Sequence, residues 1–399
     1  MDTSEACKDI VIVGAGPAGL SVARLLASSG LSVVVVDKLS RDAVSAPAFD
    51  GRDIAMTHLS KTILMEMGVW QLFPEDAVHP LMEATVEDGG APYALHFERN
   101  DSSDEPLGYL VANHVIRRGL YESVVSCESI DLLLEREVVA VNSDARSASV
   151  TLKNSQGETS SIQAALIIAA DSRFSNTRRM MGIGAKMTDY GRVMTVCNMR
   201  HKMSHNHTAQ ECFYYGRTCA VLPLGEGVSS IVTTVPATRA AELTLMDDIC
   251  FAREMETMFE HRLGDMTLLS ERHVYPLVGA YADRFIGPRF ALIGDAAVGM
   301  HPVTAHGYNL GLRSADTLAN QILKAVAEGA DIGSQTVLQR YQWRHRLLAR
   351  PLYDGTNAIV RLFTDDRKIT RLVRKAAVRI GNNLVPFKRL ISQRLTQIR

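Results

Sequence analysis

The sequence has few cysteines, and none of them is spaced for pairing or for metal binding. Only six occur among 399 residues, and no two have the CxxC spacing of a zinc or redox site. No array of histidines and cysteines suggests zinc either. Scattered free thiols are typical of a reducing compartment. We therefore expect neither disulfides nor a bound metal ion.

Long hydrophobic runs are also missing. No apolar stretch reaches the roughly 18 residues of a membrane-spanning helix. Residues 1–5 are acidic and lack the positive and apolar regions of a signal peptide. There are no internal repeats and no low-complexity segments. These absences predict a cytoplasmic globular protein, and no nucleic-acid partner is expected.

Charge is distributed unevenly along the chain. Between Arg361 and Arg399 lie eleven of the 43 Lys and Arg residues but only two of the 44 Asp and Glu residues. This segment therefore carries a net charge of +9 and the remainder −10, although the whole chain carries −1. Residues 369–380 place apolar side chains on one helical stripe, as in a helix that lies on an anionic membrane. Packing on the chain's own domain or on a partner protein, in an oligomer or a larger complex, explains the same pattern.

A glycine-rich turn lies close to the start of the chain. Gly14-Ala15-Gly16-Pro17-Ala18-Gly19 follows an apolar strand at residues 9–13 and opens a helix that we expect over residues 17–29. The next strand, residues 31–36, contains four consecutive valines and runs straight into Asp37. Such an unbroken run predicts a central parallel strand that is buried on both faces. The pattern predicts a βαβ unit.

Each part of this unit suits a dinucleotide. Gly14 permits the tight turn, Gly16 lets the backbone approach a pyrophosphate, and Gly19 lets the helix pack on the strand. The helix N-terminus attracts phosphates, and Asp37 can accept hydrogen bonds from a ribose. The alternative is an ordinary α/β turn with coincidental glycines. The turn alone does not distinguish NAD from FAD.

Two later motifs also follow buried strands. Gly294-Asp295 ends the strand at residues 289–293, and a helix begins near Asn309. The acid can bind polyol hydroxyls, and the helix N-terminus is matched to an anionic reduced flavin. Asp295 as a mere helix cap is the alternative. In the other motif, Asp171 precedes Ser175 and Arg178, which could simply be a helix start.

In this order the three motifs resemble those of the FAD-dependent aromatic-ring hydroxylases, the class A flavoprotein monooxygenases. Within that class the chain is similar to the ubiquinone-biosynthesis hydroxylases. The closer match is carried by Asp50-Gly51-Arg52, Ala112-Asn113-His114, Tyr275-Pro276-Leu277 and the segment from Gly294 to Leu312. It spans about residues 8–355.

The resemblance implies a fold and a domain division. We expect an α/β protein with a Rossmann-like, glutathione-reductase-type FAD domain at residues 1–75, 105–181 and 280–355. An interlocked α+β substrate domain with an antiparallel sheet is expected at residues 76–104 and 182–279. Alternating runs at residues 212–223 and 228–236 support the antiparallel sheet, and residues 237–263 are predicted as helices. Residues 356–399 form the basic helical segment.

The resemblance also assigns residues to the cofactor. Around the ADP half and the pyrophosphate it implies Gly14, Gly16, Ala18, Gly19, Asp37, Arg52 and Asn113. Asp171 belongs to a motif that serves both FAD and the nicotinamide cofactor. Near the ribityl chain and the flavin ring it implies Gly294, Asp295, Pro302, Gly307, Tyr308, Asn309 and Leu310. No second βαβ unit is evident for NAD(P)H, so we expect NAD(P)H to dock transiently.

The implied reaction uses FAD, NAD(P)H and O2 to hydroxylate a phenolic, polyprenylated ubiquinone precursor through a flavin C4a-hydroperoxide. Other hypotheses remain open: hydroxylation of a soluble aromatic compound, reduction of isoprenoid double bonds, or a non-catalytic FAD-binding module. A flavin halogenase is disfavoured because the WxWxIP pattern is absent; the chain has two tryptophans, Trp70 and Trp343, far apart.

The chain departs from the family pattern at three places. Ser172 stands where glycine is usual, Val298 where histidine is usual, and Ala305-His306-Gly307 where Gly-Gln-Gly is usual. His306, beside Pro302 in the segment that borders the reacting carbon, could assist deprotonation of the phenol or hydrogen-bond the flavin. Alternatively, it fills the place of the glutamine and is structural.

Three further histidines form an HxxxHxH pattern at His201, His205 and His207. Their neighbours Lys202, Ser204 and Asn206 are polar. We therefore predict a solvated loop in preference to a metal site.

Overall fold

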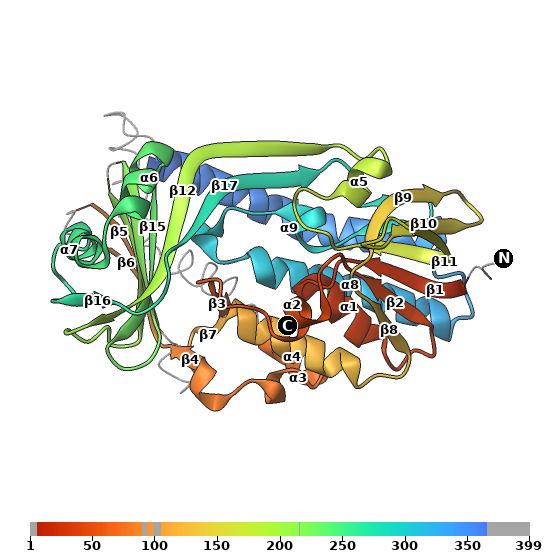
Figure 1. Ribbon diagram of the computed structural model, residues 1–399, viewed down its shortest axis with the longest axis horizontal. Helices are drawn as coiled ribbons and strands as arrows, with labels where there is room; N and C mark the ends of the chain where they lie inside the picture. Colours follow the sequence, from red (N-terminus) through yellow and green to blue (C-terminus); the bar gives the residue numbers. More distant parts are fainter. Residues whose placement is uncertain (1–5, 90–93, 99–104, 215, 365–399) are drawn as a thin grey trace.

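Two large β-sheets lie toward opposite ends of the molecule in the computed structural model, which describes residues 6–89, 94–98, 105–214 and 216–364 (Figure 1). Within these residues, the first sheet has eight strands, with a main path β18-β19-β11-β1-β2-β8 and the hairpin β9-β10 attached to β11. The second has nine, with the path β20-β17-β12-β15-β14-β13-β5-β6 and β16 beside β12. A small sheet has the order β3-β7-β4. The expected α/β class with a separate, largely antiparallel sheet is confirmed.

The eight-stranded sheet is parallel through its centre. It comprises β1 (Ala6–Val13), β2 (Val33–Val36), β8 (Ile130–Leu133), β9 (Glu137–Ser143), β10 (Ala148–Lys153), β11 (Thr159–Ala169), β18 (Ile286–Gly287) and β19 (Phe290–Leu292). Ile10 of β1 pairs with Val33 on one side and with Leu166 on the other. All four valines of β2 are buried. The central position predicted from the valine run is therefore correct.

The helix after the glycine turn is shorter than expected. α1 covers Pro17–Leu26 and does not reach residue 29. The Ser29 hydroxyl donates to the carbonyl of Leu26 and accepts from the amide of Leu31, and such local side-chain bonds compete with the helix. The next helix, α3 (His58–Glu66), begins after Thr57, whose hydroxyl accepts from the Ser60 amide at 3.3 Å.

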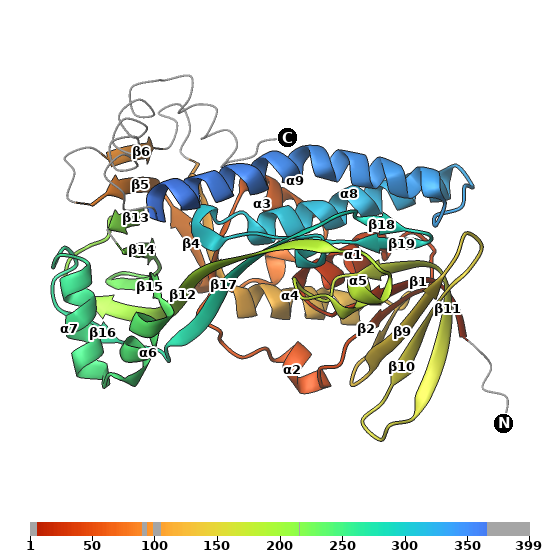
Figure 2. The same ribbon diagram turned by 90° about the horizontal axis from the view of Figure 1, so that it is seen from above.

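The longest helices lie along the core. α8 (Gly307–Ala327) packs against α1, and α9 (Gln335–Thr364) runs beside it along the length of the molecule (Figure 2). The remaining helices are α2 (Arg41–Ser45), α4 (Asn113–Val125), α5 (Asn176–Met180), α6 (Ala237–Leu245) and α7 (Asp248–Met258), with short turns η1 (Trp70–Leu72), η2 (Glu75–Ala77), η3 (Gly294–Ala296) and η4 (Pro302–Thr304). α6 and α7 confirm the helices expected after residue 237.

The nine-stranded sheet has two different faces. It comprises β5 (Glu83–Asp88), β6 (Ala94–Glu98), β12 (Ala185–His201), β13 (Thr208–Tyr214), β14 (Arg217–Pro223), β15 (Val228–Pro236), β16 (Met266–Leu268), β17 (His273–Ala282) and β20 (Val298–Gly299). Its strands are antiparallel except that β13 pairs with β5 in parallel. One face packs under α6 and α7 through Met199, Val221 and Phe251. The small sheet β3 (Asp53–Met56), β4 (Val78–Leu81) and β7 (Gly108–Ala112) is separate.

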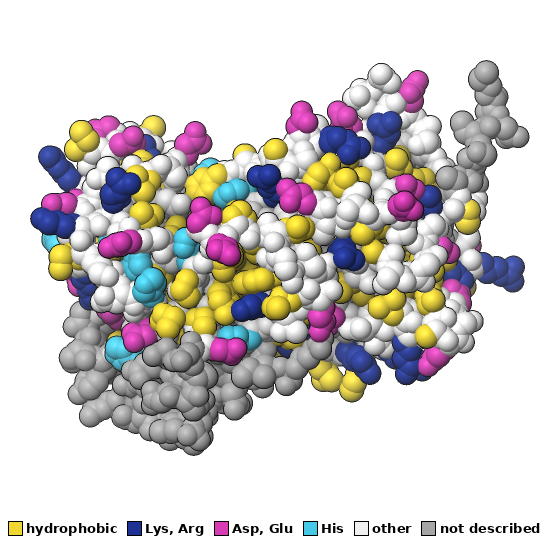
Figure 3. All heavy atoms as spheres, turned by 90° about the horizontal axis from the view of Figure 1, so that it is seen from below, with side chains coloured by type: hydrophobic (Ala, Val, Ile, Leu, Met, Phe, Trp, Pro, Cys, Tyr) yellow, Lys and Arg dark blue, Asp and Glu magenta, His cyan; other side chains and the backbone are white. Residues whose placement is uncertain are grey.

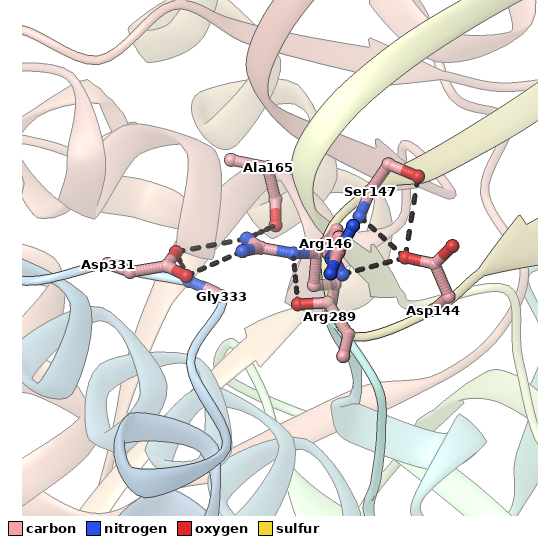
Figure 4. Close-up of polar contacts among 8 residues, drawn as sticks. Asp144, Arg146, Ser147, Ala165, Arg289, Asp331 and Gly333 are labelled. Atoms are coloured by element: carbon pink, nitrogen blue, oxygen red, sulfur yellow. Dashed lines mark hydrogen bonds and ion pairs between the residues drawn. The ribbon is translucent and has the colours of Figure 1, made fainter.

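A single arginine between β18 and β19 joins three segments of the chain (Figure 4). Arg289 donates to the carbonyls of Ala145, in the β9–β10 turn, and of Ala165, in β11, at 3.2 and 3.0 Å. Its other bonds reach the carboxylate of Asp331, between α8 and α9, at 2.6 and 3.0 Å. The Arg289 side chain is 12% exposed. It therefore links hairpin, strand and helix connection.

The described residues contain neither a disulfide nor a helix that could span a membrane. Cys7, Cys127, Cys197, Cys212, Cys219 and Cys250 are all free thiols. No helix in the described ranges is long and apolar enough to cross a membrane. The basic helix expected at residues 369–380 lies outside the described residues.

Candidate functional site

A cavity of about 1880 Å³ extends between the two large sheets. One end is lined by the glycine turn and by Asp37, and the middle by Pro302 and His306. The other end is formed by the free face of the nine-stranded sheet. A dinucleotide and a second molecule therefore have room in the same cavity.

The three glycines of the first turn have different structural roles. Gly14 has a φ of +110°, and a Cβ there would lie 2.6 Å from the carbonyl oxygen of Ala170. A Cβ on Gly19 would lie 1.9 Å from the Gly14 oxygen, whereas one on Gly16 would meet no atom within 4 Å. Gly14 and Gly19 are therefore required by the fold. Gly16 borders the open cavity, where a phosphate could approach the backbone.

The glycine-rich turn contacts both Asp37 and the third motif. One carboxylate oxygen of Asp37 accepts from the Ala15 amide at 2.6 Å, and the other accepts from Leu39 at 2.9 Å. A Cβ on Gly294, whose φ is +58°, would lie 2.8 Å from the Cβ of Ala18. The first and third motifs, far apart in sequence, are therefore in direct contact.

Arg52 and Asn113 converge on a residue that the sequence prediction did not include as a site residue. The Asp50 carboxylate accepts from Arg52 at 2.5 Å and from the Asn113 amide at 2.7 Å. Burial opposes ionisation of Asp50, but the hydrogen bond and charge of Arg52, with Asn113, lower its pKa below the ordinary value. Tyr275 donates to the Asp50 carbonyl at 2.7 Å. Asp50 therefore orients the two residues predicted near the pyrophosphate.

Asp171 is bonded mainly within its own motif. Its carboxylate accepts from the Ser175 hydroxyl at 2.5 Å and from the amide and hydroxyl of Thr177 at 3.0 and 2.8 Å. Ser175 caps α5 by accepting from the Arg178 amide. Arg178 in turn donates to the carbonyl of Ala296 at 2.9 Å. Asp171 lines the cavity while it holds the start of α5.

Arg173 contacts the acid of the third motif. It donates to the Asp295 carboxylate at 2.9 and 3.2 Å, and to the Val278 carbonyl at 2.8 Å. The Asp295 side chain remains 34% exposed, so it can accept further hydrogen bonds from the cavity. Sequence reasoning missed Arg173, because nothing local connects it to an acid 122 positions later.

Two of the departures from the family pattern share a backbone conformation. Ser172 has a φ of +81° and Ala305 a φ of +51°. Glycine adopts this left-handed region without the steric cost that other residues have, which explains why glycine is usual at both positions. The third departure, Val298, is buried in β20 and pairs with Tyr281.

His306 lines the cavity and has a buried ring nitrogen without a partner in the part of the chain that the structure describes. Its side chain is 7% exposed, and its buried Nδ1 finds no hydrogen-bond partner among the described residues. Burial lowers the pKa of His306, and a backbone contact with Thr304 opposes this. A lowered pKa favours the neutral imidazole, in which one ring nitrogen is an acceptor. Pro302, on the same loop, is exposed to the cavity.

The start of α8 is fixed by Asn309. Its side-chain oxygen accepts from the Thr57 amide at 3.1 Å and the Ser60 hydroxyl at 2.7 Å, while its nitrogen donates to the carbonyls of Ala55 and Ala305. These bonds occupy the amide with protein partners. Asn309 therefore acts on the cavity by placing the loop before α8.

The residues around Asn309 have two environments. Tyr308 lines the cavity, and burial raises the pKa of its hydroxyl, which lacks a partner within the described ranges. Leu310 is buried, and its amide donates to the His306 carbonyl at 2.8 Å. Gly307 begins the helix with open space at its Cβ position.

The far wall of the cavity is mainly apolar. The residues that line it from the nine-stranded sheet include Met194, Val196, Phe213, Ala220, Leu222, Val232 and Leu277. Such a wall suits an aromatic ring or a prenyl chain. Glu211 is a carboxyl group on this wall that sequence reasoning did not identify.

The prediction of a solvated loop for the HxxxHxH pattern is wrong for two of its histidines. His201 and His205 are each 5% exposed. The two ring nitrogens of His201 contact the Met203 carbonyl and the Ser229 hydroxyl at 2.7 and 2.9 Å, because the turn folds back onto β15. Histidines also appear on the surface at this end (Figure 3). In the part of the chain that the structure describes, no three His, Cys, Asp or Glu are grouped for a metal ion.

Comparisons with known proteins agree with this geometry. Residues 8–356 match the family model described as FAD binding domain. The chain is 46% identical to ubiquinone hydroxylase UbiM of Neisseria meningitidis, over 97% of this chain and 84% of that protein. It is 32% identical to ubiquinone hydroxylase UbiL of Rhodospirillum rubrum, over 96% and 88%. The fold resembles that of p-nitrophenol 4-monooxygenase PnpA of Pseudomonas putida, with a TM-score of 0.79 at 18% identity, over 98% and 99% of the two chains.

Proposed function

Because the chain belongs to the FAD-binding family of flavoprotein monooxygenases, we propose that it hydroxylates the aromatic ring of a phenolic, prenylated ubiquinone precursor. The observation that carries the proposal is the continuous cavity from the glycine turn to the apolar sheet wall. The names of UbiM and UbiL support the substrate class.

The residues along the cavity fit FAD. Gly16 leaves room for the pyrophosphate, and Asp37 retains acceptor capacity for the ribose. Arg52 and Asn113, oriented by Asp50, would lie by the phosphates, and Asp295 by the ribityl hydroxyls. The start of α8, from Gly307 to Leu310, offers the positive end of a helix dipole to the flavin ring. When bound, FAD supplies O2 activation with electrons from NAD(P)H.

The other residues act on the substrate and on solvent. The apolar wall excludes water from the reacting ring. His306 is proposed to accept the phenolic proton at a ring nitrogen, which would raise the electron density of the ring. If His306 only fills the place of a glutamine, its replacement by glutamine changes nothing in the reaction.

His306→Gln should lower the fraction of NADPH oxidation that yields hydroxylated product by about 10²-fold, the lower end for a lost acid–base group. FAD content should be unchanged. Product yield and NADPH consumption are measured together. Wild-type coupling in the variant would eliminate the proton-transfer role.

The proposed function is tested with purified chain, FAD, NADPH and a short-chain prenylated phenol under ¹⁸O2. The expected product carries one ¹⁸O on the ring. A reduced prenyl chain without added oxygen would instead indicate an isoprenoid reductase. Turnover of soluble phenols alone would indicate a different hydroxylase, and no NADPH oxidation with any ring would indicate a binding module. Quinone profiling of a deletion strain then identifies the ring position.

The basic segment from Arg361 to Arg399 is proposed to contact the membrane surface where a polyprenylated substrate resides. Its net charge of +9 supports this role. A chain ending at residue 360 should lose sedimentation with phosphatidylglycerol vesicles, while neither form should sediment with phosphatidylcholine alone. Unchanged sedimentation of the truncated chain would contradict membrane contact and favour a protein partner for the segment.

A further inference from the structure

Glu211 lies on the cavity wall that the nine-stranded sheet forms. It belongs to β13, where it is opposite Ala220 of β14 on one side and Val86 of β5 on the other. All three residues line the cavity. The carboxyl group is therefore set in an apolar surface, although Leu or Val would be the ordinary residue at such a position.

The loop of residues 302–306, named the flavin loop from here on, packs on the same face of β13 as this carboxyl group. Phe213 lies two residues along β13 on the same face, and its ring centroid is 4.2 Å from that of Phe363 of α9, with the ring planes tilted by 39°. Val303, in the loop that carries Pro302, packs against this pair. Residues i and i+2 of a strand are about 7 Å apart. Glu211 thus faces the space between the sheet wall and the loop that borders the reacting atoms.

No hydrogen bond or ion pair reaches the Glu211 carboxyl from the residues that the structure describes. By contrast, Asp37, Asp50, Asp171 and Asp295 each have bonded partners elsewhere along the cavity. Burial raises the pKa of Glu211 to about 8. A carboxyl group kept in an apolar wall without a protein partner costs stability unless a ligand bonds it.

We propose that Glu211 binds a ring oxygen of the aromatic substrate and so sets which ring carbon faces the flavin loop. A neutral carboxyl group donates through its O–H and accepts through its C=O. The phenolic oxygen can accept that O–H through a lone pair, which leaves the phenolic proton available to His306. This inference rests on the proposed function, and it names the residue that selects an oxygenated ring over a plain hydrocarbon ring.

The test compares ligands in the FAD-loaded protein without turnover. The probes are 2-prenylphenol and prenylbenzene, which differ by the hydroxyl alone, and binding is followed by the change in flavin absorbance. Glu211→Leu should weaken 2-prenylphenol binding by about tenfold, the effect of one lost buried hydrogen bond, and leave prenylbenzene binding unchanged or tighter. Glu211→Gln, which keeps a donor and an acceptor, should retain most of the preference.

A matched control and a second readout keep the outcome specific. Glu83→Gln, at an exposed carboxylate of β5, should change neither ligand. During turnover, Glu211→Leu should give a mixture of ring positions from 2-prenylphenol, whereas the wild type gives one.

The possible failures are distinguishable. If Glu211→Leu weakens the binding of both ligands equally, or of neither, the Glu211 inference is overturned. This holds even if the wild type hydroxylates the phenol. A wild type that binds neither ring would overturn this inference together with the proposed function.

Discussion

At the residue scale, the loop before α8 contains a conformational compromise. Ala305 is in the left-handed region, and its carbonyl accepts from the Asn309 side chain at 2.9 Å. An alanine there costs about 1–2 kcal/mol relative to a right-handed residue. The loop keeps this shape because Asn309 and the start of α8 hold it in place.

Ala305→Gly should therefore stabilise the protein slightly. Glycine removes the cost of the left-handed conformation, but its greater chain entropy in the unfolded state offsets about 0.5–1 kcal/mol of this gain. The free energy of unfolding should therefore rise by about 0.5 kcal/mol. Urea unfolding measures it. The matched control is Ala43→Gly within α2, which should lower the same quantity by about 1 kcal/mol. Equal losses in both variants would show that Ala305 is not strained.

At the element scale, Arg289 joins segments that are distant in sequence. Arg289→Met keeps the stem but removes bonds to Ala145, Ala165 and Asp331, so the free energy of unfolding should fall by about 2 kcal/mol. The exposed pair Arg118–Glu122 provides a control, because Arg118→Met should change stability by less than about 0.5 kcal/mol. Thermal unfolding and hydrogen exchange in the β9–β10 turn measure the effect.

The Arg289 contribution should also depend on pH. Hydrogen bonding from Arg289 lowers the pKa of Asp331, against burial. A carboxyl group whose pKa is lowered in the folded state stabilises the fold at pH values above its pKa in the unfolded state. This stabilisation is lost as the pH falls and the carboxylate is protonated. The difference between wild type and Arg289→Met should therefore shrink as the pH falls below about 4. A difference that is constant across this range would contradict the ion pair.

Strand ends and turn chemistry were predictable from the sequence, because they depend on short-range patterns. The valine run before Asp37 and the apolar run before Asp295 both end in acids at the cavity. The Arg173–Asp295 contact joins residues far apart in the sequence. The position of Glu211 on the cavity wall depends on strand register and on the pairing of β5 with β13 in the nine-stranded sheet. Such non-local contacts do not follow from short-range patterns. The burial of His201 was missed because its polar neighbours concealed a turn that folds back onto β15.

At the scale of the whole molecule, FAD binding and stability should be coupled through Gly16. Gly16→Ala should fold as the wild type without FAD, since its φ of −78° is ordinary and the Cβ meets nothing within 4 Å. At an FAD concentration one hundred times its Kd, the free energy of unfolding of the wild type should rise by about 2.7 kcal/mol. Gly16→Ala should gain less, because the methyl group occupies the phosphate approach.

Thermal unfolding with and without FAD measures both quantities. Gly14→Ala provides the contrast, since its Cβ would collide with Ala170 and it should be destabilised even without FAD. An FAD-dependent gain in Gly16→Ala equal to that of the wild type would refute the placement of the pyrophosphate.

The interlocking of the two sheets has a consequence during synthesis of the chain. β1 can pair with β11 only after Leu166, the partner of Ile10, has been synthesised. At about 5–20 residues per second, the delay between the synthesis of these two residues is on the order of ten seconds. The pairing of β5 with β13 is delayed in the same way, because β13 is synthesised much later. Nascent and prematurely terminated chains therefore expose unpaired apolar strand edges, the surfaces on which aggregation begins.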